Sequence, residues 1–464
     1  MSSIAEGLPQ AGRTPISFRH QAQEVLPAET IRGGVYLAAR YGLGVIVSLG
    51  NMLVMTRWVG PHAYGVFVTA IGIVAFLATL ARCGIDTYLV RSEVTPSPSV
   101  QGTAMTIILS TSLSLGLLAA AIIPLLVRWY GNREFVAPYL VLLLTIPVTG
   151  LTGVPMAKLE RALDFRSIAG IELGGQSAGL LVAVLVAWLR PSVWAPVAGQ
   201  MSWQLFTLAA TWVSAALSLR PRFCAVEARS MLAYGLVLTA SLRTWQLRSL
   251  VNPLLVARFA GAEAVAFVAL AIRIAEALGS FRLAAGRMAI AALARMQKRR
   301  EDFRAALERA LYLQVITLGP LLCAFAWLGP LVLPHLVGTR WTPSLAVYPF
   351  VAAGVLINSI YNLQASALFV VGKQWVVMRS YAAHVTLLAV ITIILLPRLG
   401  LAGYGWAEVA SCSAYVAIHA GVAKVIPISY RQLMPWVAAL LAGLFLLSWF
   451  PASFHLFELW RFSR

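Results

Sequence analysis

The chain has 464 residues, of which 60% are hydrophobic and only 11% are charged. Because soluble globular proteins carry about 25% charged residues, this composition excludes an ordinary soluble domain and predicts a membrane protein. The net charge of +19 would suggest a nucleic-acid partner in a soluble protein. In a membrane protein it reflects the Lys and Arg of cytoplasmic loops, so we expect no nucleic-acid partner.

The N-terminal stretch, residues 1–30, is polar and contains Pro9, Pro15 and Pro27. It lacks a short apolar core followed by a cleavage site, so we predict a disordered cytoplasmic tail and no removable signal peptide. The four cysteines stand singly along the chain, without the paired spacing of a metal or redox site. We therefore expect packing roles for them, and no metal, cofactor or catalytic group.

Thirteen apolar segments are candidates to cross the membrane, where a span needs about 20 mostly apolar residues and must be helical. They are residues 33–57, 63–81, 103–127, 136–157, 168–189, 193–219, 231–257, 262–286, 310–336, 345–371, 378–397, 401–423 and 434–451. The closing residues 452–464 are too few to cross again.

The distribution of positive charge predicts the orientation. Every connection on the side of the N-terminus carries at least two Lys or Arg, whereas most connections on the opposite side carry one. Since positive loops stay in the cytoplasm, we predict a cytoplasmic N-terminus. Six tryptophans then fall at the outer interface, where amphipathic indoles are expected: Trp58, Trp129, Trp188, Trp194, Trp341 and Trp406.

An internal repeat defines the architecture. Residues 51–71 realign on residues 252–272 at an offset of 201 residues, so span 1 echoes span 7. The matched pairs include Asn51 with Asn252, Leu53 with Leu254, Arg57 with Arg258, and Gly60 with Gly261. We predict an all-α polytopic membrane protein with two six-helix lobes in a parallel pseudo-twofold repeat plus one extra C-terminal helix. The N-lobe is residues 31–220, the C-lobe residues 221–425, and the extra span with a short tail residues 426–464.

Four stretches carry a resemblance to a known family. They are residues 58–65 (WVGPHAYG), 83–91, 155–166 (PMAKLERALDFR) and 193–200 (VWAPVAGQ). In these stretches the chain resembles the polysaccharide flippases of the multidrug/oligosaccharidyl-lipid/polysaccharide exporter superfamily, particularly the Wzx-like branch. The resemblance covers most of residues 31–425. It implies transfer of an undecaprenyl-diphosphate-linked saccharide between membrane leaflets, with a polysaccharide polymerase and a chain-length regulator as candidate partners.

Arginines are concentrated in residues 231–287. They are Arg243, Arg248, Arg258, Arg273, Arg282 and Arg287. An arginine at the centre of a lipid-facing helix costs about 2.5–3.5 kcal/mol, so this concentration argues for a protein-lined or watery cavity. At 1.5 Å of rise per residue, Arg243, Arg248 and Arg273 lie deepest in their spans. Arg40 lies in the inner part of span 1. The other three lie near span ends, where interface anchoring explains them. Planar guanidinium groups suit a diphosphate.

Helical spacing groups the neighbours of these arginines into two stripes. Span 1 carries Arg40, Gly44, Ser48 and Asn51, and span 7 carries Ser241, Trp245, Arg248 and Asn252. As repeat-related stripes they are candidate facing walls of a central passage, with the indole of Trp245 available to stack on a sugar. Arg248 has no acid on its own span. The alternative is that these polar stripes only pack helices together.

The acid Glu276 lies three residues after Arg273 on span 8, and the two side chains could simply neutralise each other. As the deepest acid it is also the candidate for proton or sodium coupling, whereas Glu408 lies close to an outer end. After span 8, residues 294–309 read as a basic amphipathic helix along the inner membrane face, which would contact anionic lipid.

Two other function classes stay open. A multidrug cation antiporter of the same fold would favour acids and aromatic rings in its cavity, whereas the deep charges here are mainly positive. A membrane enzyme of polysaccharide assembly, such as a polymerase or acyltransferase, would need a large external loop or an interfacial set of catalytic acids or histidines. Export of lipid II would use the same cationic chemistry, but that branch matches the sequence less well.

Overall fold

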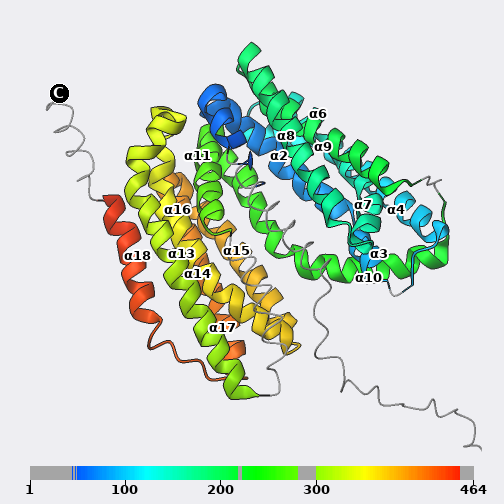
Figure 1. Cartoon of the computed structure of the whole chain (residues 1–464). Coiled ribbons are helices and arrows are strands. Elements are labelled where there is room, and N and C mark those ends of the chain that lie inside the picture. The colour runs from blue at the N-terminus through cyan, green and yellow to red at the C-terminus, as the bar shows by residue number, and fades with distance from the viewer. Residues whose placement is uncertain are drawn as a thin grey trace, which may run out of the picture.

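A computed structural model of the protein describes residues 44, 47–48, 50–92, 94–217, 222–280 and 299–449. Within these residues the chain is helical and has no strand. Figure 1 shows the helices in two bundles that lie side by side, with α2 and α11 between them. The two-lobe architecture expected from the repeat is therefore confirmed, and the protein is a multi-pass membrane protein with two related lobes.

The N-lobe begins with helical residues 50–59. Its further helices are α2 (Pro61–Ala81), α3 (Ile85–Arg91), α4 (Pro98–Ala121), α5 (Ile123–Tyr130), α6 (Val136–Leu143), α7 (Thr145–Arg161), α8 (Phe165–Leu189) and α9 (Trp194–Ala215). Proline starts two of them, because Pro61 and Pro98 occupy the first turn, where a missing N–H costs nothing. The cap of α8 is the carboxylate of Asp164, which accepts a hydrogen bond from Ser167 N.

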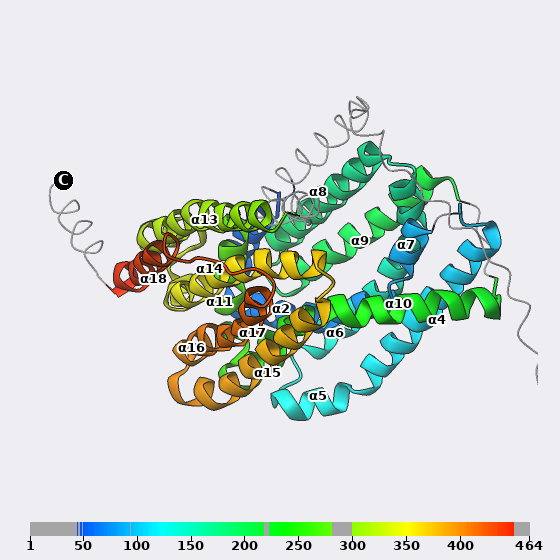
Figure 2. The same ribbon diagram turned by 90° about the horizontal axis from the view of Figure 1, so that it is seen from below.

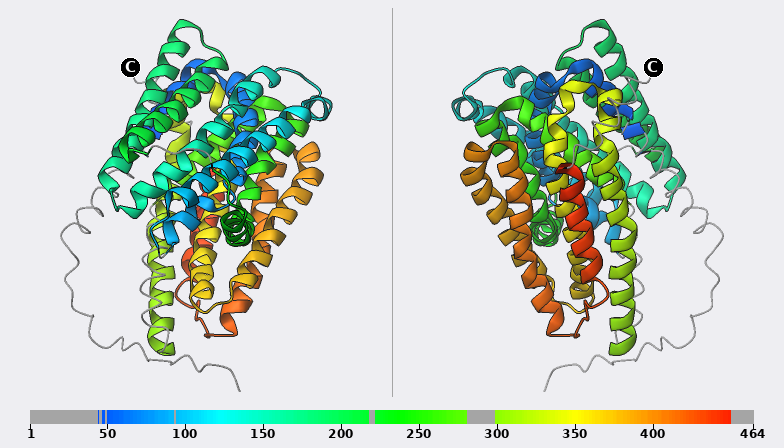
Figure 3. Two further views of the ribbon diagram at one scale, coloured as in Figure 1. Left: turned by 90° about the vertical axis from the view of Figure 1, so that its right-hand side faces the viewer. Right: turned by 90° about the vertical axis from the view of Figure 1, so that its left-hand side faces the viewer.

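The C-lobe starts with two irregular turns, η1 (Trp245–Leu250) and the π-helical η2 (Asn252–Val256). Its helices are α11 (Ala257–Leu278), α13 (Arg300–Val337), α14 (Pro343–Val370), α15 (Gln374–Leu399), α16 (Leu401–Ser411) and α17 (Val416–Ala423), with the short turns η3 (Thr339–Trp341) and η4 (Cys412–Tyr415). The extra helix α18 (Met434–Trp449) packs along α13 and α14 at the outside of the bundle (Figure 3). Eight helical stretches of the described chain are long and apolar enough to cross a membrane.

Between the lobes, α10 (Ala225–Arg243) departs from the straight span expected over residues 231–257. It passes beneath α3 and α4 of the N-lobe (Figures 1 and 2). Glu227 holds it there by accepting hydrogen bonds from Ser99 and Thr103. The chain then turns at Thr244 into η1. Within η2, Pro253 offers no N–H and forces a wider turn, a known cause of π-bulges and kinks.

The repeat is visible in the backbone at two glycines. Gly60 ends the first helical segment with φ 80° and ψ 166°, and Gly261 interrupts α11 with φ 83° and ψ 177°. Both values lie in a region that residues with a side chain rarely occupy, which is why glycine stands at both positions. The two lobes therefore bend their first span at repeat-related residues. Beside this bend, Gly65 of α2 leaves no room for a Cβ against the carbonyl of Ala262.

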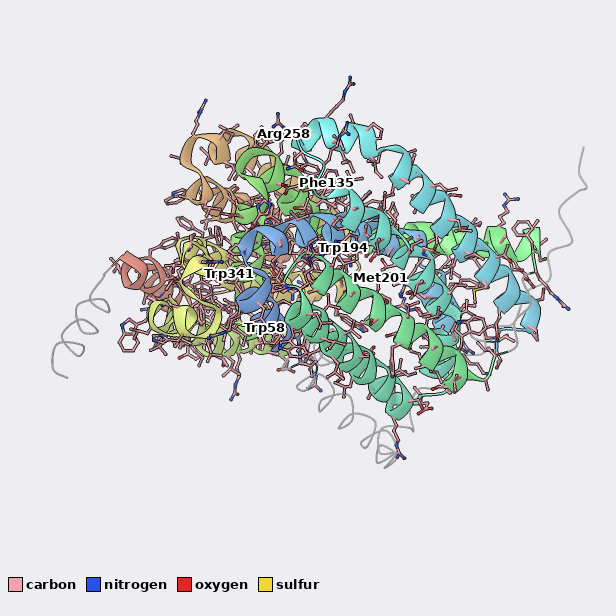
Figure 4. All side chains as sticks on the ribbon, turned by 90° about the horizontal axis from the view of Figure 1, so that it is seen from above. Trp58, Phe135, Trp194, Met201, Arg258 and Trp341 are labelled. Carbon is pink, nitrogen blue, oxygen red and sulfur yellow. The ribbon has the colours of Figure 1, made fainter. Side chains whose placement is uncertain are left out.

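At the end drawn at the top of Figure 1, here called the upper end, each lobe is tied to the other by a tryptophan. Trp341 Nε1 donates to Thr56 O at 2.8 Å, and Trp129 Nε1 donates to Leu254 O at 2.9 Å. Figure 4 looks onto this end and shows Trp58, Trp341 and Arg258 there. Of the six tryptophans expected at an interface, five are exposed, but Trp341 is 1% exposed. The expectation was wrong for Trp341, because its indole ties the lobes together inside the protein.

The basic segment at residues 294–309 also differs from expectation. Residues 300–309 are the first turns of α13, not a separate helix along the membrane surface. Phe303 and Leu307 are buried in the C-lobe core, and the carboxylate of Glu308 accepts a hydrogen bond from Ser429 N at 2.7 Å. These contacts extend the span as one helix of 38 residues. Residues 294–298 lie outside the described residues.

A candidate substrate cavity between the lobes

A cavity of about 600 Å³ lies between the two lobes. It is lined by the first span, α2, α8 and α9 from the N-lobe and by η1 and α11 from the C-lobe. Toward the upper end its lining is apolar, with Met52, Met55, Tyr64 and Phe67. The ring of Tyr64 contacts Trp341, and the two ring centroids are 5.8 Å apart. The cavity therefore adjoins the region where the lobes are tied together.

The C-lobe wall of the cavity consists of Trp245, Arg273 and Glu276. Among the described residues that line the cavity, Arg273 and Glu276 are the charged ones. They are three residues apart on α11, yet within the described part of the chain neither of them forms an ion pair. The guanidinium of Arg273 is therefore available to an anion, and the expected internal neutralisation by Glu276 is not made in this structure.

The N-lobe wall consists of Ser48, Asn51, Gln176, Gln200 and Trp203. All of these side chains are polar or amphipathic, and none is charged. Ser48 and Asn51 come from the first span, Gln176 from α8, and the other two from α9. The structure thus gives the cavity one neutral hydrogen-bonding wall and one wall that carries both signs of charge.

Close packing of α8 on α9 positions the N-lobe wall. A Cβ at Gly179 would lie 2.8 Å from the carbonyl oxygen of Gly199, and a Cβ at Gly199 would lie 2.7 Å from Cβ of Ala183. Small residues at helix crossings let backbones approach in this way. At Gly175 the space of the missing side chain is filled by Trp203, whose Cδ1 would lie 2.7 Å from an added Cβ. The glycines therefore fix both the helix pair and the indole.

Arg248 does not line this cavity. It lies in a separate small pocket with Glu408 of α16, and its guanidinium donates a hydrogen bond to that carboxylate. Glu408 is 2% exposed and lies within the C-lobe, while its position near an outer end of its span stays a prediction. The pair brings together two charges that are 160 residues apart in the sequence. Inspection of the arginine's own span therefore could not reveal its partner.

An aromatic cluster separates the two pockets. The indole of Trp245 lies 5.0 Å from the ring of Tyr381 and 5.2 Å from His384, and the guanidinium carbon of Arg248 lies 5.5 Å from the indole centroid. Trp245 and Glu276 line both the large cavity and the small pocket. Trp245 is thus supported from behind by the C-lobe core and presents its other side to the cavity.

The remaining site residues expected from the sequence have other positions. Asn252 is 7% exposed and donates from Nδ2 to Val265 O at 3.3 Å, so it packs η2 against α11. Arg40 lies outside the described residues, and Arg243 ends α10 with a side chain that the structure does not describe. Ser48, Asn51, Trp245, Arg273 and Glu276 do line the cavity, although their roles there stay predictions.

Sequence reasoning missed Gln176, Gln200 and Trp203. A usable signal was present on α8, where Gly174, Gly175 and Gly179 surround the glutamine. Such small-residue spacing indicates a close helix pair, and a polar amide inside it needs a cavity or a partner. For metals, no group of three or more potential ligands occurs in the part of the chain that the structure describes.

The family described as polysaccharide biosynthesis protein matches residues 54–346. A search of curated proteins finds no match.

Several solved structures share the fold. The lipid II flippase MurJ in an inward closed conformation has a TM-score of 0.73 at 12% identity, over 90% of this chain and 92% of that one. An inward-facing multidrug resistance MATE family transporter of the MOP superfamily has a TM-score of 0.61 at 15% identity, over 87% of this chain and 94% of that one. A MOP superfamily transporter from Pyrococcus furiosus has a TM-score of 0.54 at 14% identity, over 85% and 96% of the two chains.

Proposed function

The chain belongs to the polysaccharide biosynthesis protein family, and on that premise we propose that it is a flippase for lipid-linked saccharides. Its substrate is an undecaprenyl-diphosphate-linked oligosaccharide repeat unit, which it moves from the inner to the outer leaflet of a bacterial inner membrane. The repeat units then serve the synthesis of surface polysaccharide or exopolysaccharide. The N-terminus and the lower end of Figure 1 face the cytoplasm.

The observation that carries this proposal is Arg273, an arginine without an ion-pair partner among the described residues, on the wall of a cavity between two repeated lobes. Arg273 is exposed toward the cavity, and a cation within a membrane-spanning segment needs a counter-charge. A diphosphate supplies one and accepts two parallel hydrogen bonds from a guanidinium. The neutral saccharide would occupy the rest of the cavity, and the polyprenyl tail would stay in the lipid.

The tied upper end supports an alternating-access cycle. With Trp341 and Trp129 each bonded to a carbonyl of the other lobe, the lobes are tied together on the side that we assign to the periplasm. A substrate head group would enter from the cytoplasmic side, and release would require these ties to break. These two tryptophan hydrogen bonds are few, and their donors are repeat-related. The two lobes could therefore rock about α2 and α11, which pack against each other, so that the upper end opens and the lower end closes.

Replacing Arg273 by Gln tests the proposal. The variant keeps the helix and removes the charge, and hydrogen bonds to charged groups contribute about 1.5–3 kcal/mol. We therefore expect transfer of lipid-linked saccharide in proteoliposomes to fall by about 10-fold to 100-fold, with the same loss of surface polysaccharide in cells. Arg258→Gln on the same helix is the matched control, because Arg258 lies over Trp129 at the upper end and does not line the cavity.

The second candidate, a multidrug cation antiporter, is favoured by one feature, the carboxylate of Glu276 in the same cavity. The same acid is the candidate for proton or sodium coupling. If Arg273→Gln retained saccharide transfer and Glu276→Gln abolished efflux of an organic cation such as ethidium, the antiporter would replace the flippase as the best interpretation.

A further inference from the structure

We propose that the N-lobe wall is the saccharide subsite of the cavity, with Gln176 and Gln200 as hydrogen-bonding groups and Trp203 as a stacking platform. This inference rests on the proposed function and deepens it, because it divides the substrate between two walls. The anionic diphosphate binds the C-lobe wall at Arg273. The uncharged, hydroxyl-rich glycan binds the N-lobe wall.

The first support is that the N-lobe wall holds polar groups that the protein itself leaves without partners. The buried side-chain oxygens of Asn51 and Gln176 accept no hydrogen bond within the described chain. Ser48 is exposed and Gln200 and Trp203 are half-buried, so these three side chains can reach a ligand in the cavity. Buried polar groups in proteins are almost always paired, so unpaired ones around a cavity indicate a ligand that completes them.

The second support is the kind of group that is present. Amide side chains offer both a donor and an acceptor, which matches a sugar hydroxyl that also does both. An indole presents a flat apolar face to the C–H groups of a sugar ring and an N–H at its edge. A phosphate would instead call for cations, and the described residues of the N-lobe wall include none. The chemistry of this wall therefore selects a neutral polyhydroxyl ligand.

The third support is rigidity. The ring of Trp203 fills the space over Gly175, and Thr207 packs on the same glycine from one turn further along α9. Because α8 and α9 are held together through Gly179 and Gly199, this wall cannot shift without separating the two helices. Pre-organised groups bind with less loss of conformational entropy than mobile ones. A cavity of about 600 Å³ has the size of pockets that enclose small ligands, so both walls can contact one head group.

A binding experiment with two lipids tests the division. The probes are synthetic undecaprenyl diphosphate, which has no sugar, and the lipid-linked saccharide fraction extracted from cells that lack this protein. Binding to the purified full chain is measured by native mass spectrometry. The variant is the double replacement Gln176→Leu with Gln200→Leu. Gln204→Leu is the matched control, because Gln204 lies on α9 but does not line the cavity.

We expect wild-type protein to bind the saccharide-bearing lipid more tightly than undecaprenyl diphosphate. The double variant should bind the saccharide-bearing lipid about 10-fold more weakly, from the loss of about two neutral hydrogen bonds, and should bind undecaprenyl diphosphate as wild type does. Arg273→Gln should weaken both lipids. If the double variant unfolds in detergent, Gln200→Leu alone provides the same comparison with a smaller effect.

The other outcomes separate the two proposals. Unchanged binding of both lipids by the double variant, with weaker binding by Arg273→Gln, would overturn the saccharide subsite and leave the flippase standing. Equal weakening of both lipids by the double variant would also overturn the subsite, because the wall would then not discriminate the sugar. Binding of neither lipid by wild-type protein would overturn the proposed function itself, and with it the subsite.

Discussion

The two lobes repeat a backbone but differ in how they treat charge. Both bend their first span at a repeat-related glycine, Gly60 or Gly261, and each donates one tryptophan N–H to the other. The C-lobe nevertheless encloses an ion pair of Arg248 with Glu408 and places a second arginine in the cavity. On the N-lobe side, the cavity-lining side chains that the structure describes are all neutral.

Under the proposed function, the repeat keeps the residues that would move in transport and varies those that would bind the substrate. The glycines of the two bends recur at an offset of 201 residues, and the tryptophans of the two ties, Trp129 and Trp341, at an offset of 212 residues. A substrate with one charged end and one neutral end has no such symmetry. A cavity for it therefore has to break the symmetry of the scaffold, and here the break follows the boundary between the lobes.

We expect the largest effect on stability from substitution of Glu408, in the C-lobe. Glu408→Gln leaves the guanidinium of Arg248 buried without a counter-charge, and breaking a buried pair in this way costs about 3–5 kcal/mol. We expect a clear drop in the thermal unfolding midpoint of the detergent-solubilised protein. Asp302→Asn, which breaks the exposed pair with Arg299, is the control and should cost less than about 1 kcal/mol.

Removing both charges together sharpens the interpretation. The double variant Arg248→Met with Glu408→Leu replaces the pair by apolar groups, and such replacements are often neutral or stabilising. Restored thermal stability in this variant would show that the cost of Glu408→Gln comes from an unpaired buried charge. A double variant as unstable as the single one would instead assign the loss to packing around α16.

In the N-lobe, the position most sensitive for stability is a close contact between two helices. Gly179→Ala places a Cβ 2.8 Å from the Gly199 carbonyl, a backbone atom that cannot move aside, and overpacking of this kind costs about 1–3 kcal/mol. Gly170→Ala on the same helix meets nothing within 4 Å and should stabilise α8 by about 0.5–1 kcal/mol, because alanine favours helix. Opposite signs in thermal unfolding are the expected result. A loss of stability in both variants would contradict the steric argument.

Much of this fold was predictable from sequence, because apolar length and an internal repeat are local patterns. The apolar segments, the offset between Gly60 and Gly261, and the separate C-terminal helix were all visible in the sequence. The exceptions are residues whose conformation depends on distant contacts. The first half of span 7 became α10 because Glu227 and Gly235 dock on N-lobe residues, and the spacing of apolar residues does not encode that docking.

The site was predictable only in part for the same reason. Trp245, Arg273 and Glu276 were identified because charge or ring size marks them within their own helices. Helical spacing also grouped Arg248 with Trp245, but it could not show that Glu408 would take the arginine away from the cavity. The glycines around Gln176 are a signal in the sequence, but nothing in the sequence marks Gln200. The significance of both glutamines comes from facing a cavity, which only the assembled helices reveal.

The smallest expected effects compare the two tryptophan ties. Trp341→Phe removes the hydrogen bond to Thr56 O in a site where the indole is 1% exposed, so the lost bond is not replaced by water. A net loss of about 1 kcal/mol shifts the balance between closed and open upper ends by about fivefold. Trp129→Phe removes the corresponding hydrogen bond to Leu254 O. That indole is 40% exposed and water can replace the bond, so the shift should be smaller.

Spin labels at Arg133→Cys and Arg340→Cys, in a background without native cysteines, measure the separation across the upper end. A larger opening with Trp129→Phe than with Trp341→Phe would mean that burial does not set the strength of these hydrogen bonds. Ring packing of the tryptophans, and not their N–H groups, would then hold the two lobes together.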